Sequence, residues 1–326
     1  MARKLLLVTL AVLFPVVVGA ILTAPPPLTL QAGKISLPED IGAFLANREA
    51  AVDNNFGLIP GTEKRIRWHA DEPGQKTPYS IVYLHGFSAT RQETAPVSEI
   101  IADAIGANMF ETRLTGHGRE RMALENVTAE DWLSDAAEAL AVGARLGSRI
   151  VVIGTSTGAT LAMAMARHPL SARVTSYVMI SPNFAPLDRS AEFLTFPGGP
   201  QLARIVVGSH YRWQARNELQ AKFWTTDYPM ASVVEMMRLV QFTRAQLPMT
   251  LEQRVLTIMS PADTVVSPQE TKAALQKITA PGKELIEFVA SVDEGQHVLA
   301  GDILSPESNA AIASHIINFL SAHESR

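Results

Sequence analysis

The sequence predicts an α/β fold in which a doubly wound, mostly parallel sheet carries an inserted helical cap. Short apolar runs alternate with segments of helical spacing, and one long interval interrupts that alternation. Strands buried on both faces of a parallel sheet are almost continuously apolar, because helices cover both faces. Strands are therefore expected at residues 79–84, 108–112, 149–153, 174–180, 254–259 and 284–289, with an early or edge strand at 63–69.

Helices are expected between these runs, where apolar residues recur at helical spacing. They are predicted at residues 96–105, 128–146, 157 to about 168, and 307–320, and a helix at 37–52 is expected outside the sheet. Thr128 with Asp131 three residues later resembles a capping box in which Asp replaces Glu. The helix that ends near Leu146 should therefore begin at this pair.

The alternation stops between Pro182 and Gln253. A structureless loop of that length is improbable in a compact domain, and the interval is rich in aromatic and Met side chains. We expect a core formed by residues 37–182 and 254–326, with residues 183–253 inserted as a mostly helical cap.

Composition excludes several classes of function. The chain has 326 residues and a formal net charge of −4 without long charged runs, so a nucleic-acid partner is not expected. It contains no Cys, which excludes disulfides, thiolate metal sites and a cysteine nucleophile. No closely spaced His, Asp and Glu cluster or phosphate-binding loop appears, so neither a metal nor a cofactor is expected.

The N-terminus indicates a targeting segment. Arg3 and Lys4 precede an apolar run from Leu5 to Leu22, and a stiff Pro25-Pro26-Pro27 stretch follows. Residues 1–24 are therefore predicted to be a signal peptide or a membrane anchor, and residues 25–36 a linker. The two cations on the leading side predict that the remainder lies outside the cytoplasm. It would be periplasmic or secreted, or associated with a membrane through residues 5–22.

Ser156 is the candidate nucleophile. It stands in Gly154-Thr155-Ser156-Thr157-Gly158, between a predicted buried strand and a predicted helix. In that context the glycines allow a tight strand-to-helix turn that exposes the serine hydroxyl. The same pattern in a plain turn would carry no chemistry, so the flanking strand and helix are what favour catalysis.

A serine hydroxyl needs a base, and the base needs an orienting acid. His297 follows the last predicted strand, and Asp263 follows the strand at 254–259, so the chain order is serine, acid, histidine. Asp263 is preferred because active sites of open α/β sheets gather at the carboxyl ends of the strands. The other acids considered are Asp227, Asp293 and Asp302.

Two backbone N–H groups should bind the oxyanion that forms during acyl transfer. One belongs to Thr157, the residue after the nucleophile. The other is expected from Phe87, because Gly86 before it permits a close backbone approach. His85 is interpreted as structural, packed under this loop.

The chain resembles the α/β-hydrolase superfamily, most of all its monoacylglycerol lipases and serine-aminopeptidase-type hydrolases. The resemblance rests on the segments at 85–88, 113–118, 131–132, 154–158, 263–266 and 296–297. It implies an α/β-hydrolase fold and a Ser–His–Asp mechanism without a cofactor, with Ser156 as nucleophile, His297 as base and Asp263 as its orienter. It also implies Phe87 and Thr157 as amide donors. Thr115, Thr155 and Thr157 depart from the family's usual residues.

The leading functional hypothesis is a serine hydrolase that cleaves carboxylic esters of a lipid-like or other small apolar acyl substrate. An aminopeptidase or amidase is the alternative, and it would need acidic cap residues to hold a substrate ammonium. The available acids are Glu192, Glu218, Asp227 and Glu235. A non-catalytic binding protein of the same fold is a third hypothesis, because fold alone does not establish function.

Overall fold

The computed structural model describes residues 25–30, 35–119 and 121–322. The predicted signal peptide or anchor at residues 1–24 lies outside the described residues. Within the described part, no helix combines the length and apolar character needed to cross a membrane.

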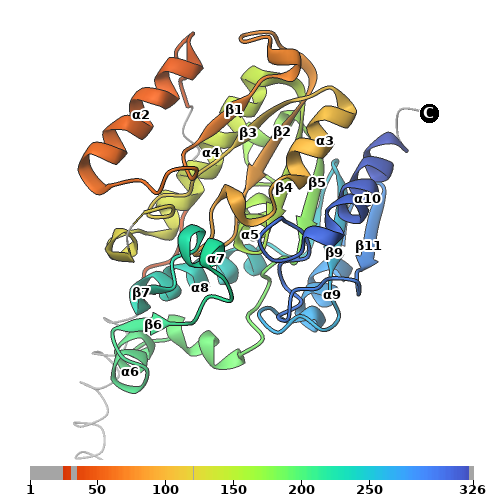
Figure 1. Ribbon diagram of the computed structural model, residues 1–326. Helices are drawn as coiled ribbons and strands as arrows, with labels where there is room; N and C mark the ends of the chain where they lie inside the picture. Colours follow the sequence, from red (N-terminus) through yellow and green to blue (C-terminus); the bar gives the residue numbers. More distant parts are fainter. Residues whose placement is uncertain (1–24, 31–34, 120, 323–326) are drawn as a thin grey trace, which may run out of the picture.

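The described chain forms one main sheet of seven strands in the order β1-β3-β2-β4-β5-β9-β11 (Figure 1). The strands are β1 (Arg65–Arg67), β2 (Thr77–Leu84), β3 (Asn108–Glu111), β4 (Gly147–Thr155), β5 (Val174–Ile180), β9 (Arg254–Met259) and β11 (Lys283–Glu287). Only β1 runs antiparallel among these described strands, and it lies at the edge as predicted. The mostly parallel sheet predicted from the apolar runs is confirmed.

Helices cover both faces of this sheet. Helices α3 (Val97–Ile105) and α10 (Asn309–Ser321) pack together on one face, while α4 (Ala129–Leu146) and α5 (Thr157–Ala164) pack on the other (Figure 1). Strand β2 shows why: Ile81 and Tyr83 belong to one apolar cluster, and Val82 and Leu84 to the other. Successive side chains of a strand point to opposite faces, so a continuous apolar run supplies both cores.

Two helix boundaries follow from local chemistry. Thr128 and Asp131 form the reciprocal hydrogen bonds of a capping box, as predicted, and α4 begins directly after Thr128. Helix α5 ends at Ala164, short of the predicted end near His168. The reason is Pro169: the residue before a proline is disfavoured in helical conformation, and His168 is extended and caps the next 3-10 turn instead.

The segment between β5 and β9 forms several short elements and one long helix. They are η5 (Arg189–Thr195), α6 (Gly199–Val206), β6 (His210–Arg212), α7 (Glu218–Phe223), β7 (Asp227–Pro229), α8 (Met230–Ala245) and β8 (Met249–Thr250). Strands β6 and β7 pair antiparallel, and α8 packs on α5. Within the predicted insertion at 183–253, we call residues 189–245, from the start of η5 to the end of α8, the cap. It lies in the lower part of Figure 1, beneath the sheet.

The remaining elements complete the periphery. Helix α2 (Ile41–Phe56) lies outside the sheet and packs Ile41 and Leu45 into the larger core. The others are α9 (Pro268–Gln276), β10 (Ile278–Thr279), which pairs with β8, and the 3-10 turns η1 (His69–Asp71), η2 (Arg91–Glu93), η3 (Arg121–Leu124), η4 (Pro169–Arg173) and η6 (Pro306–Ser308).

Candidate active site

Ser156 lies on the sharp turn that joins β4 to α5. Its backbone has φ 52° and ψ −117°, a conformation that non-glycine residues rarely adopt. Such strain persists only where the surrounding structure enforces it, and it is typical of a nucleophile elbow. The Ser156 N–H donates to the Ile180 carbonyl at 2.9 Å, which ties the turn to the end of β5. The residue is 7% exposed.

The two glycines of the motif let the backbones meet. A Cβ added at Gly154 would lie 2.6 Å from the Ala159 nitrogen, so only glycine permits this contact between β4 and α5. A Cβ added at Gly158 would lie 2.5 Å from the carbonyl carbon of Leu84 and 2.7 Å from the His85 oxygen. Helix α5 therefore packs directly on the end of β2, which brings Ser156 close to the loop that follows β2.

Gly158→Ala is expected to destabilise the protein by about 2 kcal/mol or more, because backbone atoms cannot yield to the new methyl group as a flexible side chain could. Urea denaturation would measure the change in the free energy of unfolding. Ala311→Gly, at an exposed position of α10, serves as a control for helix propensity, which costs only about 1 kcal/mol. An unchanged unfolding midpoint for Gly158→Ala would contradict the proposed contact.

His297 and Asp263 are joined directly. The imidazole Nδ1 lies 2.7 Å from Asp263 Oδ2, and both side chains are buried. The other carboxylate oxygen of Asp263 accepts the N–H groups of Val265 and Val266, at 2.8 and 2.9 Å, which holds the acid in place. With Nδ1–H donating to this carboxylate, Nε2 is left as the acceptor that a general base requires.

The end of β5 links the backbones of Ser156 and His297. Ser181, directly after Ile180, donates its hydroxyl to the His297 carbonyl at 2.7 Å, while Ile180 accepts the Ser156 N–H. Among the described residues, no hydrogen bond joins Ser156 Oγ to the imidazole. Without substrate the contact between nucleophile and base is often loose, and it tightens when substrate binds.

The other acids considered from the sequence have different partners. Asp293 Oδ2 accepts the N–H groups of His297 and Val298, at 2.9 and 3.0 Å, and its other oxygen bonds Arg216 from the cap. Asp302 bonds Asn309, and Asp227 bonds His210 and Arg212 within the cap. Asp263 is therefore the acid that contacts the imidazole, while Asp293 shapes the loop that carries it.

The loop after β2 carries Phe87, the second predicted amide donor. The N–H groups of Phe87 and Thr157 find no acceptor elsewhere among the described residues. His85 beneath this loop is fully buried, with Nδ1 against the Gly86 carbonyl and Nε2 accepting the Leu114 N–H. These contacts give His85 a structural role. The loop is also tied to the cap, because the backbone N–H of Thr225 donates to the Ser88 carbonyl at 2.7 Å.

Glu93 is a further residue of the site, and the sequence did not reveal it. Its side chain is buried in η2, and its Oε2 accepts the Gly86 N–H at 2.8 Å. Burial raises the pKa of Glu93 to about 7, although the Gly86 N–H and the charge of His297 act in the opposite direction. No motif marks this glutamate, because only the fold brings it beneath the loop.

The charge of His297 is balanced by two carboxyl groups. Burial disfavours the imidazolium, but the hydrogen-bonded Asp263 and the nearby Glu93 together raise the pKa of His297 above its usual value. Imidazolium formation is therefore supported at the moment when a base takes up the serine proton. Across the described residues, no group of three or more His, Asp or Glu side chains is arranged to hold a metal ion.

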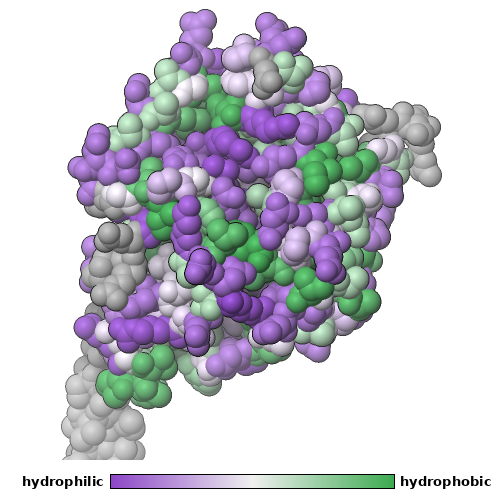
Figure 2. Space-filling model, in the orientation of Figure 1, coloured by the Kyte–Doolittle hydropathy of each residue, from purple (hydrophilic) through white to green (hydrophobic). Residues whose placement is uncertain are grey.

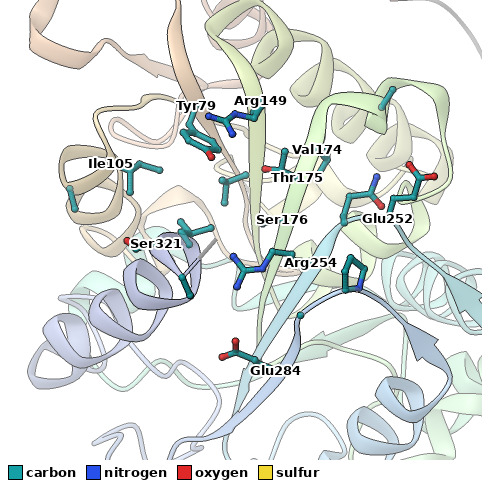
Figure 3. A pocket seen from close by; sticks show the side chains of 18 residues that line it. Tyr79, Ile105, Arg149, Val174, Thr175, Ser176, Glu252, Arg254, Glu284 and Ser321 are labelled. Carbon is teal, nitrogen blue, oxygen red and sulfur yellow. The ribbon is translucent and has the colours of Figure 1, made fainter. Parts of the chain in front are cut away.

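A large cavity of about 810 Å³ lies at the opposite end of the strands from Ser156. It is lined by residues at the amino ends of β4, β5 and β9, including Arg149, Val174 and Arg254 (Figure 3). The guanidinium groups of Arg149 and Arg254 stack on the rings of Tyr79 and Phe319. Because Ser156 follows the carboxyl end of β4, this cavity lies away from Ser156, at the other end of the same strand.

Comparisons with known proteins agree with this architecture. Solved structures with the same fold include a metagenome-derived lipolytic enzyme from a study of LipS and LipT, at 20% identity and a TM-score of 0.67, covering 82% of this chain and all of that one. A monoglyceride lipase variant from Saccharomyces cerevisiae matches at 11% identity and a TM-score of 0.61, covering 92% and 99%. The monoacylglycerol lipase of Paleococcus ferrophilus matches at 13% identity and 0.57, covering 80% and 98%.

At these identities the structural matches establish the fold alone. A search of curated proteins found no match. A family model described as the alpha/beta hydrolase family matches residues 81–302, which include Ser156, Asp263 and His297. The α/β-hydrolase fold and the resemblance inferred from the sequence are thereby confirmed, and the chain belongs to the alpha/beta hydrolase family.

Proposed function

We propose that this protein is a serine hydrolase that cleaves carboxylic esters through Ser156, His297 and Asp263. The observation that carries the proposal is the buried Asp263–His297 hydrogen bond at the strand edge where Ser156 occupies its strained turn. A nucleophile on an elbow, a base in the correct tautomer and an orienting acid are the components of acyl transfer.

The proposed reaction has two halves. His297 Nε2 takes the Ser156 proton as Oγ attacks the ester carbonyl, and the oxyanion that forms is bound by the N–H groups of Phe87 and Thr157. The imidazolium then protonates the leaving alcohol, which leaves an acyl group on Ser156. Water, deprotonated by the same imidazole, attacks this acyl-enzyme and releases the acid.

We propose a lipid-like acyl substrate, and the surface of the cap supports it. Exposed apolar side chains gather on α6 and its flanks, namely Phe193, Phe196, Leu202, Ile205, Val206 and Val207. Figure 2 shows this green patch at lower left, over α6. Large exposed apolar patches mark sites of interaction with proteins or membranes. Together with the predicted apolar segment at residues 5–22, the patch supports action at a lipid surface outside the cytoplasm.

The aminopeptidase alternative finds no support in the cap. Glu192 pairs with Arg189 and Arg244, and Glu235 pairs with Arg238. Asp227 is bonded to His210 and Arg212. Three of the four acids that could hold a substrate ammonium are thus already neutralised by cations, so no observation favours this second function.

A fluorophosphonate probe tests the proposed function. We expect the full chain to be labelled at Ser156, because phosphorus is attacked by the activated hydroxyl with loss of fluoride. We further expect p-nitrophenyl esters of medium acyl chains to be cleaved at least about 100-fold faster, by kcat/KM, than aminoacyl anilides. An unlabelled Ser156 would refute the serine hydrolase, and faster cleavage of the anilides would refute the ester preference.

A further inference from the structure

Glu93 is a second buried carboxyl group in the catalytic centre, and the proposed reaction leaves it without a role. Its residue is 2% exposed. Oε2 accepts the Gly86 N–H at 2.8 Å, and the Tyr83 hydroxyl lies 3.3 Å from the same oxygen. Burying a carboxyl group is costly, so one placed here needs compensation or a function.

The position of Glu93 relative to Ser156 follows from Gly86. A Cβ built on Gly86 would lie 2.7 Å from Glu93 Oε1 and 3.2 Å from the Ser156 Cβ. The carboxyl group of Glu93 and the Cβ of Ser156 therefore both lie close to Gly86. Gly86 immediately precedes Phe87, the proposed amide donor, so a bond to the Gly86 N–H also orients the next peptide unit.

We propose that Glu93 is a positioning residue with two effects. It holds the loop of Gly86 and Phe87 in place through the Gly86 N–H, and it places a second negative charge near the His297 imidazole. This inference rests on the proposed serine hydrolase function. The charge favours the imidazolium that forms when Ser156 is deprotonated, in addition to the hydrogen bond that Asp263 accepts from Nδ1 of His297.

Several titratable groups face this pair. Asp263 on the β9 side bonds the imidazole, and Asp293 binds the His297 backbone N–H. Tyr83 on β2 faces Glu93, and its hydroxyl also bonds Thr94 and Thr155. Burial and the charge of Glu93 hold the pKa of Tyr83 well above its ordinary value, so the phenol stays neutral. Burial raises the pKa of Glu93 to about 7, and Asp263 and Glu93 raise the pKa of His297 above its usual value.

The sign of the effect is set by what the base must do. His297 has to be neutral to accept the serine proton, so activity falls as the pH drops through the pKa of His297. A negative Glu93 raises that pKa and moves the loss of activity to higher pH. Neutralising Glu93 should therefore keep the enzyme active at lower pH.

Glu93→Gln separates charge from geometry, because its amide oxygen still accepts the Gly86 N–H. On a p-nitrophenyl ester, we expect the acid limb of kcat/KM against pH to move to lower pH. Near pH 7, where the Glu93 carboxyl group begins to ionise, the variant should retain a larger share of its own plateau activity than the wild type retains of its own. Glu93→Ala also loses the acceptor, so its plateau kcat should lie about ten-fold below that of Glu93→Gln.

Glu111→Gln is the matched control. Glu111 is another buried carboxyl group, on β3, and it pairs with Arg65 and Arg91 and not with the histidine. We expect this variant to lose stability while its normalised pH profile remains that of the wild type. A purely structural role for Glu93 predicts the same unchanged profile for Glu93→Gln, and that result would overturn the inference.

A measurement on the wild-type chain does not depend on the folding of any Glu93 variant. Nuclear magnetic resonance of ¹⁵N-labelled histidine, with His297→Ala to assign the signal, follows the imidazole as the pH changes. We expect the ¹⁵N chemical shifts of the ring to change in two steps, because the ionisation of Glu93 alters the electrostatic field at the imidazole. A single step would overturn the inference, whereas failure of the wild type to react with the fluorophosphonate would reject the proposed function itself.

Discussion

Replacing Ser156 with alanine is expected to lower kcat/KM for a p-nitrophenyl ester by about 10⁴-fold or more and to abolish fluorophosphonate labelling. The hydroxyl on the turn between β4 and α5 is the atom that would carry the acyl group, and the chain has no Cys to replace it. Kinetics with the purified full chain, together with mass spectrometry of the labelled peptide, would measure both effects.

Ser134→Ala is a suitable control for this experiment. Ser134 lies on the exposed side of α4, where its hydroxyl bonds the Glu130 carbonyl within the same helix. We expect this variant to retain wild-type activity and labelling. If Ser156→Ala retained labelling at another residue with full activity, the nucleophile would have been assigned to the wrong side chain.

Asp263→Asn is expected to reduce kcat by about 10⁴-fold while leaving the fold intact. The carboxamide is nearly the same shape and can still accept the N–H groups of Val265 and Val266 through its oxygen. Its NH₂ group, however, would donate to Nδ1 of His297 and so favour the tautomer with a proton on Nε2. That tautomer cannot accept the serine proton.

Asp227→Asn distinguishes the acid that contacts the base from an acid of the cap. Asp227 bonds His210 and Arg212 in the cap. We expect its kcat to stay within a few-fold of the wild type, as measured on the same ester. A larger loss from Asp227→Asn than from Asp263→Asn would contradict the assignment of the orienting acid.

The strands of the core were predictable because burial on both faces leaves an unambiguous pattern. The runs at 174–180 and 254–259 correspond to β5 and β9 at both ends. The start of α4 was predictable for another reason: its capping box depends on residues only three apart. Local signals of this kind need no knowledge of the rest of the fold.

Boundaries set by competing signals were less accurate. Helix α5 ends before the Ala- and Met-rich pattern ends, because His168 precedes Pro169 and caps the following turn. The last predicted strand was placed one residue late at its start, and its side chains are mostly exposed at the edge of the sheet. An edge strand has only one neighbour, so its sequence carries a weaker pattern.

The residues of the candidate site likewise differ in how far a local sequence pattern identifies them. Ser156 has a local signature, because the elbow requires glycines at fixed positions around the nucleophile. Asp263 is preferred over Asp293 from the sequence because it follows a predicted strand, and the structure shows that both acids contact residue 297, one at the ring and one at the backbone. Glu93 has no signature, because its importance comes from lying beneath Gly86.

The sequence by itself determined the class of sheet, the elbow and the chain order of the three chemical groups, since each depends on near neighbours or on burial along a strand. Only the tertiary structure decided which carboxyl groups approach the imidazole and how the cap's acidic residues are paired. Those facts depend on contacts between segments far apart in the chain, whose free energy arises only when the sheet brings them into a shared, water-poor space.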